Sequence, residues 1–106
     1  MDQREYVGRL LAAYCATPGT CGMARRADRL LAQQLYQREI PLPAVENAFA
    51  LAAVRRLVRP DGAGPLSVIR SLAYFLPVLD EVLSSTVDSG YYQHVRSKLQ
   101  RLTTAR

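Results

Sequence analysis

Arginine is the residue type whose chemistry is most prominent in this sequence. It supplies 13 of the 14 basic side chains, and the 106-residue chain carries a formal net charge of +5. A guanidinium group donates hydrogen bonds in a planar fork that matches phosphate oxygens, and it also stacks on bases. The composition therefore favours contact with nucleic acid, although a GC-rich genome enriches arginine codons in the same way without any change of function.

The basic side chains gather in three clusters along the chain. Residues 22–40 carry a net charge of +2, residues 55–70 carry +3 and residues 91–106 carry +4, whereas residues 71–90 sum to −3. We predict phosphate contacts from all three clusters, with a tyrosine in the third available to stack on an unpaired base. The first cluster comprises Arg25, Arg26 and Arg29, the second Arg55, Arg56 and Arg59, and the third Tyr91, Arg96, Lys98 and Arg101.

Two of these clusters also have a purely structural interpretation. The first cluster opens a predicted helix, whose positive end favours an anion. Its arginines are equally compatible with solvation or with ion pairs inside the molecule, to Asp28, Glu5 or Glu46. The second cluster closes a predicted helix, where positive side chains complement the negative end of the helix dipole.

The sequence offers few residues for catalysis. Asp80 and Glu81 are adjacent, so on a helix they point about 100° apart and cannot share a proton as a catalytic pair does. His94 is the only histidine, and no serine or cysteine near it in the sequence makes a catalytic triad with it. The glycines do not form a phosphate-binding loop after a strand. We therefore expect no enzymatic activity and no cofactor.

Cys15 and Cys21 flank the turn-forming residues 17–20. The turn can bring the two sulfur atoms together, but a reducing compartment favours two free thiols. A zinc site would need further ligands at suitable spacing, and the single histidine and the carboxylates do not supply them. We expect two thiols and no metal.

Helical periodicity of the apolar residues predicts the first two elements of the fold. The first helix is expected at about residues 3–16, with one buried stripe formed by Tyr6, Val7, Leu10, Leu11 and Tyr14. The second is expected at about residues 24–38, with its inward face formed by Ala27, Leu30, Leu31 and Leu35.

Three further helices follow in the sequence. Pro43 suits the first turn of a third helix, whose run of small and apolar residues predicts a central position packed on more than one side. A flexible loop is predicted at residues 60–65. Ser67 is expected to cap a fourth helix that kinks or restarts at Pro77, and Asp88 or Ser89 to cap a fifth.

No alternating pattern typical of a strand occurs in the sequence, so we predict an all-α fold, a compact bundle of about five helices in one domain spanning residues 1–106. The longest stretches without charge are too short to cross a bilayer. The N-terminal residues are polar and lack the apolar run of a secretory signal, which predicts a cytoplasmic location without membrane association.

Residues 40–83 resemble the helical DnaD-type domain of primosomal helicase-loading and phage or plasmid replication proteins. The resemblance rests on two stretches, Pro43–Ala48 at the start of an alanine-rich helix and Ser71–Phe75 within the next helical segment, with a variable loop between them. It implies a nucleic-acid-binding, self-associating helical module without enzymatic activity.

These observations predict a non-enzymatic, sequence-tolerant accessory protein of a replication or mobile-element system that binds DNA or RNA through phosphate contacts. One alternative is a small helical protein-interaction subunit of a larger nucleoprotein complex, in which basic and acidic segments of neighbouring copies meet. A second alternative is a regulatory adaptor protein.

Overall fold

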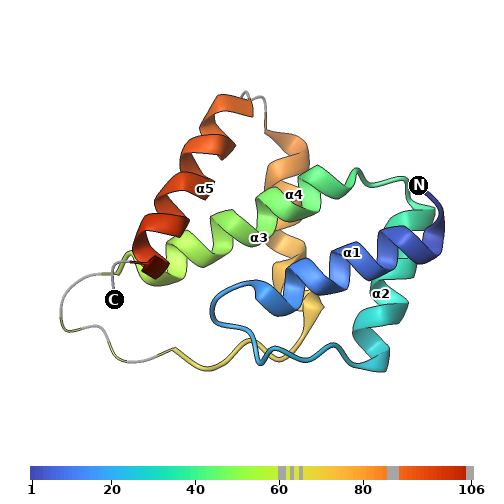
Figure 1. Ribbon diagram of the computed structural model, residues 1–106, viewed down its shortest axis with the longest axis horizontal. Helices are drawn as coiled ribbons and strands as arrows, with labels where there is room; N and C mark the ends of the chain where they lie inside the picture. Colours follow the sequence, from blue (N-terminus) through green and yellow to red (C-terminus); the bar gives the residue numbers. More distant parts are fainter. Residues whose placement is uncertain (60–61, 63, 65, 86–88, 105–106) are drawn as a thin grey trace.

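Helices account for nearly all of the regular structure. The computed structural model describes residues 1–59, 62, 64, 66–85 and 89–104. Its elements are α1 (Gln3–Ala16), α2 (Arg26–Gln37), α3 (Leu42–Leu57), a short 3₁₀ helix η1 (Leu72–Phe75), α4 (Leu76–Ser84) and α5 (Ser89–Thr104) (Figure 1). Among the described residues no strand occurs, and the predicted all-α bundle of five helices is confirmed.

Two of the predicted features fall outside the described residues. The loop predicted at residues 60–65 lies mostly outside them, and Asp88, one of the two predicted caps of α5, lies outside them altogether. None of the helices in the described part of the chain combines the length and the apolar composition that a bilayer crossing requires.

Helix α3 is the element around which the others pack, as its composition predicts. It crosses the middle of the molecule (Figure 1) and contacts α1, η1, α4 and α5. Every residue from Ala48 to Val54 is buried, because neighbours cover more than one side of the helix. The small alanine side chains let these neighbours approach closely, and the buried residues form one continuous hydrophobic cluster.

Helix α1 follows its predicted bounds and its predicted buried stripe. Asp2 caps the first turn, because its Oδ1 accepts a hydrogen bond of 2.8 Å from the Glu5 backbone N–H. Tyr14, at the other end of the buried stripe, lies with Phe49 and Phe75 in an aromatic cluster whose ring centroids are 4.8–6.3 Å apart. Burial raises the pKa of Tyr14 to about 12. This cluster joins α1, α3 and η1.

The start and the inward face of α2 differ from the prediction. The helix begins at Arg26, and Arg25 is its N-cap in an extended conformation. Ala27 and Leu30 are exposed, and the buried positions are Asp28, Ala32 and Leu35. The helix is rotated relative to the expected face because a carboxylate, which the hydrophobic pattern cannot reveal, occupies the inner side of its first turn.

The fourth helix also begins later than predicted. Ser67 caps no helix; Ser71 instead caps η1, with its Oγ accepting from the Ala73 N–H at 3.1 Å. Helix α4 then begins at Leu76 with Pro77 in its first turn, so the predicted restart at Pro77 is confirmed. The preceding residues are extended because the backbone of Ile69 is hydrogen-bonded elsewhere.

The partner of Ile69 is the loop that follows α1. Its N–H donates to the Gly19 carbonyl at 2.8 Å, and its carbonyl accepts from the Cys21 N–H at 2.9 Å. These two bonds form a parallel bridge between Thr20 and Ile69. With its N–H and carbonyl bonded to the loop after α1, Ile69 cannot take part in a helix, although its side chain is buried in the core.

The carboxylate of Asp28 connects this extended segment to α2. Asp28 is only 2% exposed. Its Oδ2 accepts from the Arg25 backbone N–H and its Oδ1 accepts from the Leu72 backbone N–H, both at 2.9 Å. One buried side chain thus caps α2 and holds the start of η1, two segments that are 44 residues apart in the sequence.

We predict that Asp28→Ala lowers the free energy of unfolding by about 2–4 kcal/mol, because two buried N–H groups lose a charged acceptor. Asp28→Asn should lie between the parent and the alanine variant, since an amide presents one acceptor atom and one donor to the two N–H groups. Urea unfolding followed by circular dichroism measures the change.

Asp80→Ala is the matched control, because Asp80 is an exposed carboxylate in α4. Its effect should stay within about 0.5 kcal/mol. Equal stabilities of Asp28→Ala and Asp80→Ala would contradict this role of Asp28.

Candidate functional site

The first arginine cluster lies at the exposed amino end of α2. Arg25, Arg26 and Arg29 are all exposed. Among the residues that the structure describes, the ion pairs are Arg9–Glu5 and Arg55–Glu81, and no guanidinium of the first cluster forms an ion pair or a hydrogen bond. The first cluster therefore directs three cations into solvent.

Three acidic residues were candidates for pairing with the first cluster. In the described part of the chain, none of them forms an ion pair with it. Both carboxylate oxygens of Asp28 accept backbone N–H groups, and Glu5 pairs with Arg9 at 3.0 Å within α1. Glu46 is half-buried in α3 and lines a surface cavity beside Arg96. The two structural interpretations of the first cluster were solvation and ion pairing inside the molecule. In the structure its arginines are solvated.

Arg70 is a further exposed cation, and the sequence patterns did not indicate it as a site residue. It lies between Ile69, which is bonded to the loop after α1, and Leu72, whose N–H is bonded to Asp28 in the first turn of α2. These attachments bring Arg70 close to the first cluster although more than 40 residues separate them in the sequence. The sequence pattern predicts Ile69 in a helix, which excludes hydrogen bonds between Ile69 and residues 19–21. Without those bonds, the position of Arg70 could not be predicted.

In the second cluster, Arg55 is already paired. Its Nη1 donates to Glu81 Oε2 at 2.8 Å, and its Nη2 contacts the other carboxylate oxygen of Glu81, which joins α3 to α4 in a two-pronged ion pair. The hydrogen bond from Arg55 lowers the pKa of Glu81, and the same bond raises the pKa of Arg55. A phosphate must compete with this carboxylate for Arg55.

Arg56 is largely used to hold the extended segment. Its Nη2 donates to the Ser67 carbonyl at 2.7 Å, its Nη1 to the Tyr74 hydroxyl at 3.3 Å, and its guanidinium carbon lies 5.7 Å from the centre of the Tyr74 ring. The backbone of Gly19 passes against the same guanidinium. Tyr74 is 46% exposed and makes these contacts, whereas the neighbouring Phe75 is buried.

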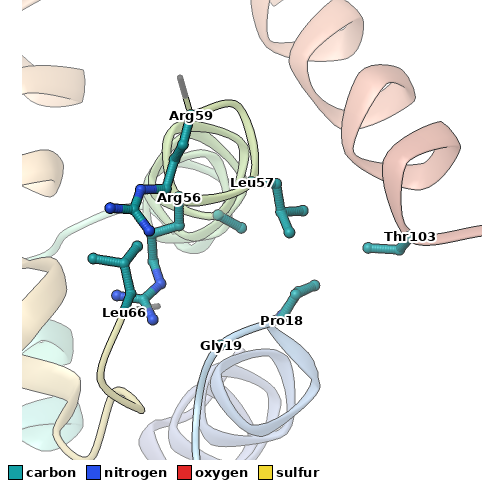
Figure 2. A pocket seen from close by; sticks show the side chains of 8 residues that line it. Pro18, Gly19, Arg56, Leu57, Arg59, Leu66 and Thr103 are labelled. Atoms are coloured by element: carbon teal, nitrogen blue, oxygen red, sulfur yellow. The ribbon is translucent and has the colours of Figure 1, made fainter. Parts of the chain in front are cut away.

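Arg59 and Arg56 border a surface cavity of about 400 Å³ between the ends of α3 and α5. Figure 2 shows the two arginines on the side of Leu66, with Thr103 of α5 on the opposite side and Pro18 and Gly19 below. Arg59 is exposed, and its Nη1 donates to the Gly64 carbonyl. The cavity is lined by apolar residues and by two arginines. Some of the guanidinium N–H groups of these arginines already donate hydrogen bonds within the protein.

The third cluster is spread over α5. Arg96 donates to Asn47 Oδ1 at 2.6 Å, and Lys98 is half-buried in a cavity beside Arg55. Arg101 is exposed in the last turn of the helix. Tyr91 is 43% exposed and stacks edge-on against the buried Tyr92 at 5.2 Å.

The three clusters do not form one continuous site. The start of α2 and the end of α3 lie at opposite sides of the molecule, and the third cluster follows α5 (Figure 1). The extended segment runs from Ser67, bonded to Arg56, to Leu72, bonded to Asp28, and so connects the second cluster to the first. The structure brings Arg70, not the second or third cluster, to the first.

The residues considered for catalysis or metal binding do not come together in one site. Within the described part of the chain no group of three or more histidine, cysteine, aspartate or glutamate side chains is arranged to hold a metal ion. Cys15 and Cys21 are free, half-buried thiols, and His94 and Asp80 are exposed.

No protein-family model matches this chain, and comparisons with curated proteins and with solved structures also give no match. The resemblance to the DnaD-type domain therefore stays a prediction from the sequence.

We predict that Gly19→Ala destabilises the protein by about 1–3 kcal/mol, because φ is +96° and a Cβ would lie 2.9 Å from Arg56 Nε. In an Arg56→Ala background the cost should fall but not vanish, since the backbone strain remains. Urea unfolding of the single and double variants measures both contributions.

Gly8→Ala is the matched control, because Gly8 lies in the interior of α1 with nothing within 4 Å of the added Cβ. It should raise the stability by about 0.5–1 kcal/mol. A destabilisation by Gly8→Ala as large as that by Gly19→Ala would refute this explanation of Gly19.

Proposed function

We propose that this protein is a non-enzymatic accessory protein that binds nucleic acid through phosphate contacts with little preference for base sequence. The observation that supports this most is the first cluster, three exposed guanidinium groups that form no ion pair among the described residues. Such side chains remain available to anionic partners.

The physical basis is the release of counterions from a polyanion. Each phosphate neutralised by an arginine releases condensed cations into solution, and this gain is independent of the bases. The positive end of the α2 dipole adds to the attraction, because an anion there also meets the partial charges of the first-turn N–H groups. Counterion release and the attraction to the helix dipole both depend on charge, so both contributions to affinity weaken as salt is added.

The arginines are not expected to contribute equally. Among the described residues, Arg25, Arg26, Arg29 and Arg70 have no acidic partner to displace. Arg55 must give up its ion pair with Glu81 before it binds a phosphate, and the hydrogen bonds of Arg56 to Ser67 and Tyr74 hold the fold together. We therefore infer that the first cluster and Arg70 form the main contact surface, with Arg59, Arg96, Lys98, Arg101 and Tyr91 as secondary contacts.

The biological process is proposed from the sequence resemblance. A DnaD-type relationship implies a role in a replication or mobile-element system, with self-association as a further property. Of its two stretches, one opens the central helix α3 and the other forms η1 with its cap, and both pack in the same core.

Replacing Arg25, Arg26 and Arg29 together by alanine should weaken binding uniformly across sequences. The slope of log affinity against log salt should fall by about one for each phosphate that the variant no longer neutralises. The measurement is a titration of fluorescently labelled single- and double-stranded DNA and RNA at several salt concentrations, starting at low salt.

The matched control replaces Arg4, Arg9 and Arg38, three exposed arginines outside the clusters, and removes the same net charge. It should reduce affinity less than the first-cluster variant does. If the parent binds none of the nucleic acids, or if the two triple variants bind equally, the arginines serve another partner and the protein-interaction subunit becomes the leading function.

A further inference from the structure

The segment from Leu66 to Arg70 is non-helical, lies at the surface and carries one isolated parallel bridge, between Ile69 and Thr20. On its inner edge, the N–H and carbonyl of Ile69 are bonded to Gly19 and Cys21. The Ile69 side chain points into the core and is 3% exposed. Successive residues of a strand alternate in direction, so the neighbours of Ile69 face outward.

The outer edge of this segment carries backbone groups that make no hydrogen bond to any described residue. Because N–H and carbonyl groups also alternate between the two edges, those of Val68 and Arg70 point away from the loop that binds Ile69. Within the described part of the chain they form no hydrogen bond. Both residues are exposed, so the edge is accessible to another chain.

This edge is held in place from both ends. Arg56 binds the carbonyl of Ser67 at 2.7 Å, and Asp28 binds the N–H of Leu72 at 2.9 Å. A strand that is fixed before binding loses little conformational entropy when a partner pairs with it. The backbone is therefore arranged for strand addition, in which main-chain hydrogen bonds supply affinity and alternate side chains supply selectivity.

The outward side chains define the chemistry of the partner. Leu66, which also lines the cavity beside Arg56 and Arg59, and Val68 are 46% and 48% exposed and present apolar surface, and Arg70 presents a cation two residues beyond Val68. The first cluster begins four residues after Cys21, whose N–H binds the Ile69 carbonyl, and adds positive charge near this end of the segment. An extended peptide with an apolar residue and a carboxylate two positions apart on one face is complementary to this surface.

We propose that the outer edge of residues 66–70 binds an extended acidic segment of a partner protein by strand addition. A second copy of this chain fits less well. Pairing two such edges antiparallel would set Arg70 opposite Leu66 and would bring the arginines of both first clusters together without a carboxylate between them. In the described part of this chain the adjacent acids Asp80 and Glu81 are in α4, not in an extended segment.

The test uses an eight-residue peptide with the sequence Thr-Val-Thr-Glu-Thr-Val-Thr-Glu, acetylated at its N-terminus and amidated at its C-terminus. Valine and glutamate then lie two positions apart on one face of the extended peptide. The peptide is titrated into ¹⁵N-labelled full-length protein. The backbone amide signals of Val68 and Arg70 should shift and become protected from hydrogen exchange, while that of Ile69 is protected throughout. A peptide with lysine in place of glutamate should bind more weakly by about tenfold or more, because it meets like charge.

Two variants at one position separate backbone pairing from side-chain contact. Val68→Pro removes the outward N–H without breaking an internal bond, and proline is tolerated on such an edge, so the fold should persist. Peptide binding should fall by about tenfold or more, as expected when one ladder hydrogen bond is removed and the edge is blocked. Val68→Ala, which keeps the N–H, should retain most of the affinity.

The inference fails if the peptide does not bind, if Val68→Pro binds it as well as Val68→Ala does, or if only other amides shift. A rise in mass to a dimer without peptide, measured by sedimentation and abolished by Val68→Pro, would assign the edge to a second copy instead. Val68→Pro should leave DNA affinity unchanged, so failure here is distinguishable from failure of the proposed nucleic-acid binding.

Discussion

The carboxylate of Asp28 is the interaction on which the arrangement of the surface depends. A buried carboxylate is costly unless it is hydrogen-bonded, and Asp28 accepts one N–H from Arg25 and one from Leu72. The same side chain therefore caps α2 and holds the extended segment against it. Because both oxygens face backbone groups, neither is available to an arginine side chain.

Two consequences for charge follow from this use of Asp28. The arginines of the first cluster remain solvated, since the nearest carboxylate in the sequence is directed inward. Arg70, carried by the extended segment, is brought to the same end of α2. By contrast, Arg55 of α3 and Glu81 of α4 form an ion pair with each other at the surface. The molecule thus separates cations that stabilise its helix packing from cations that face solvent.

The sequence predicts those elements whose determinants are local. The stripe of α1 and the central position of α3 follow from periodicity and composition, and the start of α4 beside Pro77 follows from the chemistry of proline. Contacts between distant segments were not predictable in this way. The apolar periodicity gives no sign that Ile69 is hydrogen-bonded to a loop nearly 50 residues earlier, or that Asp28 binds the backbone N–H of Leu72, 44 residues later. Arg70 was missed for the same reason.

The central claim is that solvated arginines at the start of α2, and not the paired ones on α3, meet phosphate. The most direct measurement follows the Nε–Hε signals of the arginine side chains by NMR while a short mixed-sequence DNA duplex is added at low salt. We predict saturable shifts for Arg25, Arg26, Arg29 and Arg70 and little change for Arg55. Shifts that are largest at Arg55, or absent from all four of the others, would contradict this claim.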